Sequence, residues 1–177
     1  MNSLASKHVD WCLNKAEKEI EESVKLGKNA KHRGLLKVEP SKELAIAHID
    51  KAKHYLGAIQ LLKKNNFSDL AVSCGFYSLY HCFLAIAIKF GYESKNQTCT
   101  ISLIEFLQEE GKISVDRDII EFMKYEEVHN QHEASLIELR EDYTYGTNLE
   151  IKDDEQLDKI EKRCLSFIDA VREIVYS

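Results

Sequence analysis

Apolar residues recur along this chain at spacings of three and four, and few residues interrupt that pattern. The 177 residues include one proline and seven glycines, the residues that most often break a helix. Spacings of three and four place apolar side chains on one face of an α-helix, whereas strands show alternation. The sequence therefore predicts an all-α protein, and we expect no sheet.

The apolar stripes predict the first three helices. One covers residues 3–26, with an inward stripe of Val9, Leu13, Ala16, Ile20 and Val24, and Gly27 stops it. A second covers residues 41–64, with Ser41 as its N-cap. A third covers residues 68–90, with Ser68 as its N-cap and Gly91 at its end. Because this third stretch is apolar almost all round, we expect it at the centre, with Leu84 and Ile88 both buried.

The second half of the chain predicts shorter helices. A fourth begins at Thr100 or Ser102 and ends at Gly111, a fifth spans residues 116–128 with a possible continuation to Leu139, and the last opens at Asp153. Short connections favour antiparallel neighbours. The whole chain, residues 1–177, is thus predicted to be one domain, an up-and-down helical bundle of four to six helices.

Composition indicates a soluble, reduced protein. Of the residues, 44% are hydrophobic and 31% charged, which is typical of globular proteins. No uninterrupted apolar run reaches the length of a membrane span, and the N-terminus does not resemble a signal peptide. The five cysteines include no C-x-x-C pair. We therefore expect reduced cysteines, a cytoplasmic location and no contact with membranes.

The charges are unevenly distributed along the sequence. Residues 25–64 hold an excess of Lys and Arg, and residues 105–162 an excess of Asp and Glu. The basic part suits phosphate groups. Two alternatives remain open: solvated helix faces of opposite sign, or a homodimer in which the two parts complement each other.

Two polar clusters interrupt the apolar pattern and supply the candidate site residues. The first combines Tyr77 and His81 in the third helix with Glu93, Lys95 and Asn96 in the turn that follows. The second consists of Arg140, Tyr143 and Tyr145. An arginine offers a planar fork of donors for phosphate, and tyrosines offer faces on which a base stacks. The alternative is structural: Arg140 pairs with a nearby carboxylate, the tyrosines cap the bundle, His81 is a core histidine and the turn residues hydrogen-bond within the turn.

These features resemble the HEPN family of small helical-bundle domains. The resemblance covers residues 43–175. It consists of HIDKAKHYLGAIQLL, the following FYSLYH, the glycine turn KFGYESKN with its short helix, and then Arg140, Asp142 and Tyr143 before a terminal helix. The helix over residues 1–27 is an addition. Many members are metal-independent ribonucleases with an Arg-x(4–6)-His motif, and no arginine of this chain has that spacing.

The resemblance implies a nucleotide- or RNA-binding module that dimerises, in a prokaryotic toxin–antitoxin or phage-defence setting, often beside a nucleotidyltransferase. Arg140, Tyr143 and Tyr145 would contact the ligand, supported by Tyr77, Glu93, Lys95 and Asn96. Two alternatives are a divergent endoribonuclease that uses Arg140 with His81 or a tyrosine, and a non-catalytic partner-binding subunit. His129 and His132 with Glu133 have helical metal-ligand spacing but lack a further ligand, so we expect neither a metal nor a cofactor.

Overall fold

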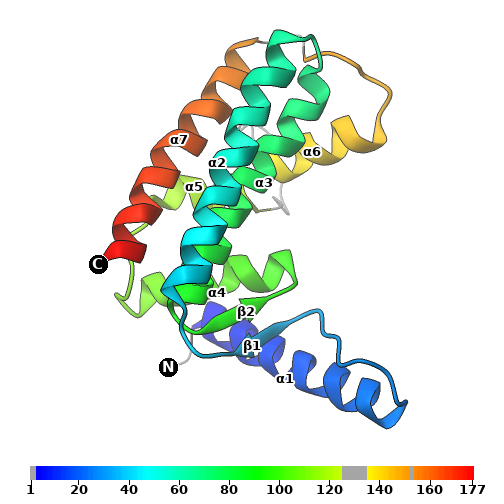
Figure 1. The fold of residues 1–177 in the computed structure, drawn as a ribbon, viewed down its shortest axis with the longest axis vertical. Coiled ribbons are helices and arrows are strands. Elements are labelled where there is room, and N and C mark those ends of the chain that lie inside the picture. The colour runs from blue at the N-terminus through cyan, green and yellow to red at the C-terminus, as the bar shows by residue number, and fades with distance from the viewer. Residues whose placement is uncertain (1–2, 125–134, 152–153) are drawn as a thin grey trace.

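The computed structural model describes residues 3–124, 135–151 and 154–177, and it is an all-α bundle, as predicted. The described residues form seven helices, which are α1 (Leu4–Lys25), α2 (Lys42–Lys64), α3 (Ser68–Lys89), α4 (Gln97–Glu109), α5 (Arg117–Phe122), α6 (Leu136–Tyr145) and α7 (Asp154–Tyr176). Figure 1 shows α2, α3 and α7 running side by side as the body of the bundle, with α1 and α4 at its base.

Helix α3 is the central element, because α2, α4, α6 and α7 all pack against it. Its buried side chains include Phe76, Leu79 and Phe83, and the Phe83 ring meets Phe167 of α7 edge to face at 5.4 Å. By length and composition α3 is the one described helix that could cross a membrane, and 67% of its most apolar window is buried inside the protein. That burial is expected of the core helix of a bundle.

The burial of α3 differs from the prediction at Leu84. Ile88 is buried, whereas Leu84 is only partly buried. Leu84 lies three residues after His81 and seven after Tyr77, so the three share one helix face. This face is the least covered strip of α3, since Tyr77 is also exposed and His81 partly so.

Several helix ends agree with the sequence and others differ. Ser41 caps α2 as expected, and Ser3, the predicted first residue of the first helix, is the N-cap of α1; each side chain accepts a hydrogen bond from the first turn. Ser68, however, is the first residue of α3 rather than its cap, and its hydroxyl accepts from the backbone N–H of Ile151 at 2.8 Å. Helix α4 begins at Gln97 with Asn96 as N-cap, earlier than Thr100 or Ser102. The fifth predicted helix, residues 116–128, is shorter within the described part and ends at Phe122.

The expectation of no sheet was wrong. Strands β1 (Leu35–Lys37) and β2 (Tyr92–Ser94) pair antiparallel, with Leu35 opposite Ser94. Each strand has three residues, too few for alternation to show in the sequence. Gly91 directly precedes β2 with φ of +80°, and a Cβ there would lie 2.9 Å from the Val38 carbonyl oxygen. The residue therefore has to be glycine for the chain to turn and for the segments to approach each other.

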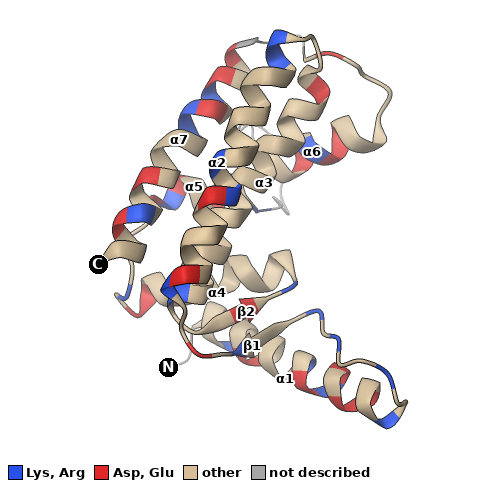
Figure 2. Cartoon of the chain, in the orientation of Figure 1, with Lys and Arg blue, Asp and Glu red and all other residues tan. Residues whose placement is uncertain are grey.

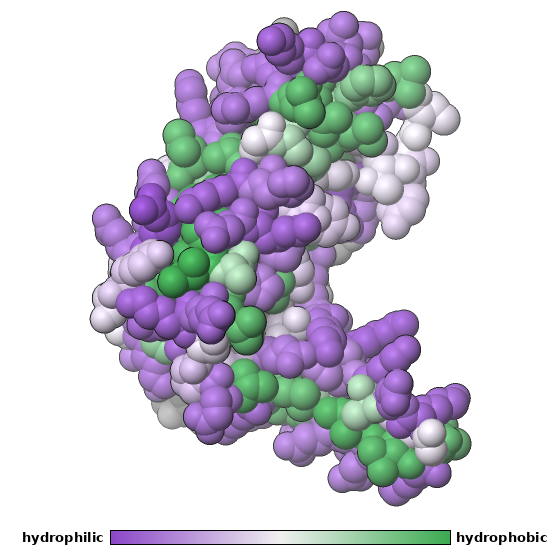
Figure 3. All heavy atoms as spheres, in the orientation of Figure 1, coloured by the Kyte–Doolittle hydropathy of each residue, from purple (hydrophilic) through white to green (hydrophobic). Residues whose placement is uncertain are grey.

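Helix α1 is attached at the base and projects away from the bundle (Figure 1). It packs on α4 and β1 through its first half, where Val9, Cys12 and Ala16 are buried. The predicted inward stripe does not extend to the end of the helix, because Val24 is 62% exposed. Figure 3 shows the protein hollowed on one side, between the half that carries α6 and the half that carries α1.

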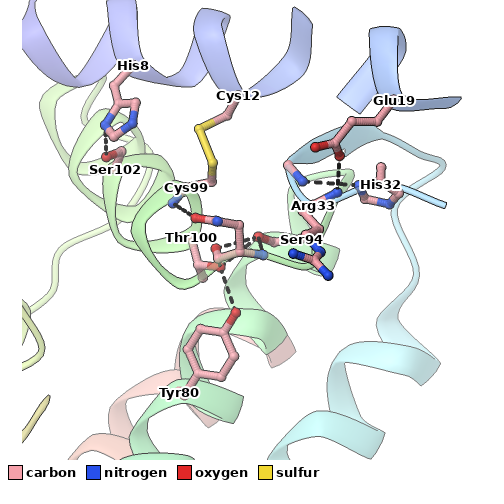
Figure 4. Close-up of a disulfide and its surroundings, with 12 residues drawn as sticks. His8, Cys12, Glu19, His32, Arg33, Tyr80, Ser94, Cys99, Thr100 and Ser102 are labelled. Atoms are coloured by element: carbon pink, nitrogen blue, oxygen red, sulfur yellow. Dashed lines mark hydrogen bonds between the residues drawn. A yellow bond between two sulfur atoms is a disulfide. The ribbon is translucent and has the colours of Figure 1, made fainter. Parts of the chain in front are cut away.

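A disulfide joins Cys12 of α1 to Cys99 of α4 (Figure 4). The expectation that all cysteines are reduced was therefore wrong for this pair, whereas Cys74, Cys82 and Cys164 are free thiols. The two bonded residues are 87 positions apart in sequence, and only the packing of α1 on α4 brings them together. Beside the disulfide, the Ser102 hydroxyl and His8 Nδ1 share a hydrogen bond of 2.8 Å across the same two helices.

Candidate functional site

Tyr77 and His81 lie one turn apart on the open strip of α3, and α2 supplies the side chains opposite them. The Tyr55 ring is 5.4 Å from the Tyr77 ring and 5.6 Å from the His81 ring, with interplanar angles of 29° and 19°. The Lys51 ammonium lies 5.3 Å from the centre of the Tyr55 ring. With His48, these residues form the stacked surface, defined here as His48, Lys51, Tyr55, Tyr77 and His81.

His48 and His81 are directly hydrogen-bonded. Their Nδ1 atoms are 3.0 Å apart, while the ring centres are 5.2 Å apart. Because the nitrogens are much closer than the ring centres, the two rings meet end to end through Nδ1 rather than face to face. One Nδ1 must carry the hydrogen and the other must accept it, so the two rings take opposite tautomers when both are neutral. Neither Nε2 bonds to the described part of the chain.

The surroundings of the two histidines favour the neutral rings. Burial, together with the charges of His48 and Lys51, lowers the pKa of His81 to about 4. Burial also lowers the pKa of His48. At neutral pH the His81 ring is thus uncharged. Because the two neutral rings take opposite tautomers, only the ring that donates through Nδ1 keeps an unused lone pair, on its Nε2.

Arg140 lies beside the stacked surface, held in place by aromatic and acidic neighbours. Helix α6 begins with a capping box of Ser135 and Glu138, which fixes its first turn. The Arg140 guanidinium lies 4.4 Å from the centre of the Phe76 ring, and its Nη2 is 3.3 Å from Glu141 Oε1. The Phe76 ring in turn contacts Tyr77 at 5.3 Å between ring centres. Only 19% of the Arg140 side chain is exposed, so its role includes packing as well as charge.

The two tyrosines of α6 differ in environment. Tyr143 is partly buried against the core, whereas Tyr145, the last residue of the helix, is 81% exposed. Tyr145 therefore has a free aromatic face for a ligand, and Tyr143 contributes to packing. The Thr144 hydroxyl lies 3.5 Å from that of Ser73 and links α6 to α3 between them.

The turn residues lie elsewhere, at the β2 strand and the start of α4. Lys95 Nζ is 2.8 Å from Glu93 Oε1, and the same oxygen is 3.4 Å from His32 Nε2. The hydrogen bond from Lys95, followed by the influence of His32, lowers the pKa of Glu93 against the opposing effect of burial. Asn96 Oδ1 accepts from the Cys99 backbone N–H at 3.0 Å, so this side chain is the N-cap of α4.

The predicted site is therefore divided between two places. In the described part of the chain, Glu93, Lys95 and Asn96 make no hydrogen bond, ion pair or ring contact with Arg140, Tyr143, Tyr145 or Tyr77. A chain of hydroxyls lies between the two: Tyr80 Oη is 3.2 Å from Thr100 Oγ1, which is 2.7 Å from Ser94 Oγ. Figure 4 shows this chain below the disulfide.

Sequence reasoning missed His48, Lys51 and Tyr55. Their signal is a second helical face on α2, since Lys51 and Tyr55 are four apart and His48 and Tyr55 are seven apart. This face was overlooked because the buried apolar stripe of α2 follows the same helical spacing and accounted for the pattern by itself.

Among the described residues, no group of three or more His, Cys, Asp or Glu side chains could hold a metal ion. The His129, His132 and Glu133 pattern lies outside the described residues.

No family model matches the chain, and no curated protein has a significantly similar sequence.

Proposed function

We propose that this chain is a HEPN-like nucleotide- or RNA-binding module of a prokaryotic toxin–antitoxin or phage-defence system, acting in the cytoplasm as a homodimer, with a nucleotidyltransferase as a possible protein partner. The observation that carries the proposal is the stacked surface. Tyr77 is 39% exposed, its ring is supported by Tyr55, and Lys51 and Arg140 bring positive charge to the same neighbourhood.

This arrangement supports binding of bases rather than of phosphate alone. An aromatic side chain offers each base a stacking face, and nearby cations attract the phosphodiester backbone. Tyr77 and Tyr145 are the exposed aromatic faces, and Arg140 has guanidinium N–H groups beyond the one directed at Glu141. Tyr143 packs α6 against the core. Glu93, Lys95 and Asn96 are not needed for this surface.

The binding of a fluorescent single-stranded RNA, measured by anisotropy at low salt, tests the proposal. Tyr77→Ala should weaken binding by about 1–3 kcal/mol, the value of one base–aromatic contact. Arg140→Lys should weaken it less than Arg140→Ala, because lysine keeps the charge but loses the planar fork. Tyr176→Ala is the matched control, since Tyr176 is a tyrosine of α7 that is 54% exposed.

Wild-type protein that binds neither RNA nor nucleotides at any salt concentration would refute the proposal. If Arg140→Ala also fails to fold, the polar cluster only holds helices together. The partner-binding subunit is then the better interpretation, and the contacts of Arg140 with Phe76 and Glu141 already favour that alternative.

The hydrogen-bonded histidines favour a second candidate, the divergent endoribonuclease. In the neutral pair, the ring that donates through Nδ1 has an Nε2 lone pair that can accept a proton, and the Nδ1–Nδ1 hydrogen bond connects the two rings for proton exchange. In this activity the pair, rather than His81 with Arg140, would perform proton transfer. Cleavage of RNA that is lost in both His48→Gln and His81→Gln, while RNA binding persists, would establish the enzyme.

A further inference from the structure

A pocket of about 630 Å³ lies between α1 and the segment that follows it. This segment, residues 26–34, is called the connector below, and the cavity the connector pocket. Its lining consists of one face of α1, the connector and one residue after β2: Glu19, Glu22, Ser23, Leu26, Lys28, Lys31, His32, Arg33 and Lys95. It shares no residue with the stacked surface.

The walls of the connector pocket are fixed by hydrogen bonds. Gly27 has φ of +64° and turns the chain back along α1. The Arg33 backbone N–H donates to Glu19 Oε2 at 2.5 Å, which ties the far end of the connector to the helix (Figure 4). The His32 side chain is 3% exposed and faces Glu93, and the Lys95 backbone N–H donates to the Gly34 carbonyl oxygen. The cavity is therefore bounded on three sides by anchored backbone.

The charges around the pocket are not neutralised within the protein. Figure 2 shows basic residues along the connector and acidic residues on α1. The side chains of Lys28, Lys31 and Arg33 make no ion pair with the described part of the chain, and Lys95 is already shared with Glu93. The lining holds four cations, Lys28, Lys31, Arg33 and Lys95, against the two carboxylates of Glu19 and Glu22. This excess of positive charge favours a bound anion.

We propose that the connector pocket binds a small ligand that carries two or more phosphate groups. The volume falls within the range of roughly 300–1,000 Å³ found for small-molecule sites. Arg33 suits bidentate contact with a phosphate group, and Lys28 and Lys31 supply point charges beside it. Glu22, on the opposite wall, is left to accept a hydrogen bond from a neutral donor of the ligand such as a hydroxyl. The pocket is open to solvent on its remaining side, and its volume is that of one compact ligand rather than of a continuous RNA strand.

Inorganic triphosphate tests whether phosphate charge is sufficient for binding to the pocket. ATP tests whether the base and ribose of a nucleotide add affinity. Both are titrated into the full-length protein by calorimetry at low salt. Lys28→Gln/Lys31→Gln should weaken triphosphate binding by about tenfold or more, since it removes two charge-assisted contacts. Lys7→Gln/Lys18→Gln is the matched control, because it removes the same charge from exposed positions of α1 outside the pocket.

Equal losses in the two double variants would overturn the proposal, because binding would then reflect net charge only. Absence of triphosphate and ATP binding in the wild type would also overturn it. If RNA alone binds and the Lys28→Gln/Lys31→Gln variant loses it, the pocket is an RNA contact and the small-ligand proposal fails. The stacked surface is tested separately, since Tyr77→Ala should lower RNA binding and leave triphosphate binding unchanged.

Discussion

Gly75 tests how closely α3 packs on α7. This glycine lies in the middle of α3, where alanine is ordinarily better by about 1 kcal/mol. A Cβ at this position would lie 2.4 Å from Cγ2 of Ile160, a residue of α7 that is 1% exposed. That methyl group is bonded directly to the Ile160 Cβ, so it cannot move away as the end of a flexible chain would. The helices would have to separate.

We therefore expect Gly75→Ala to destabilise the protein despite its better helix propensity. Overpacking of a core costs about 1–3 kcal/mol, and the propensity gain offsets about 1 kcal/mol of this. The expected net loss in the free energy of unfolding is thus up to about 2 kcal/mol. Urea unfolding followed by circular dichroism at 222 nm, under non-reducing conditions, measures it.

Two backgrounds separate the steric clash from other causes. Ile160→Ala removes Cγ2, so in that background Gly75→Ala should become stabilising by about 1 kcal/mol, with a coupling of the size seen for residues in contact. Ile160→Val removes only Cδ1 and keeps Cγ2, so there Gly75→Ala should remain destabilising. The reasoning would be refuted if Gly75→Ala stabilised the otherwise wild-type protein. It would also be refuted if Gly75→Ala changed the free energy of unfolding equally in the Ile160→Ala and Ile160→Val backgrounds.

Two further predictions concern the disulfide and the histidine pair. Reduction of the Cys12–Cys99 bond should lower the free energy of unfolding by roughly 2–5 kcal/mol, as for other long loops closed by a disulfide. A reductant should not change the thermal midpoint of the Cys12→Ala/Cys99→Ala variant, which is the control. If a reductant also left the thermal midpoint of the wild type unchanged, the disulfide would be contradicted. Burial lowers the pKa of His81 from 6.5 to about 4. The unfolded chain therefore binds more protons between those values, so stability should be flat above pH 6.5 and fall as the pH drops toward 4. In His81→Gln the fall between pH 7 and pH 5 should be smaller, and an identical pH profile would show that His81 does not titrate in this way.

The sequence predicted the helices well because each carries its own signal. Spacings of three and four marked the stripes of α1, α2 and α7, and Ser3, Ser41, Gly27 and Gly91 marked ends that the structure confirms. These signals lie within a few residues of each other along the chain. The misplaced starts of α3 and α4 are instructive, because Ser68 and Ser102 bond to distant partners, Ile151 and His8, rather than to their own helices.

The candidate site was predicted less well, because it depends on which faces of different helices meet. Tyr77 and His81 were recognised as polar or aromatic residues in an apolar helix, and Arg140 as part of a cluster with Tyr143 and Tyr145. The sequence did not reveal that Tyr55 lies against Tyr77 or that His48 lies against His81. It also did not reveal that Lys95 lies beside the connector, away from the stacked surface.

What the sequence by itself determined is the helical class, the central place of α3 and most helix boundaries, since hydrophobic periodicity and capping act locally. Tertiary structure alone decided the Cys12–Cys99 bond, the β1–β2 pairing, the His48–His81 hydrogen bond and the connector pocket. Each of these depends on the contact of segments separated by many residues. Such contacts are set by the packing of side chains in three dimensions and leave no periodic trace along the chain.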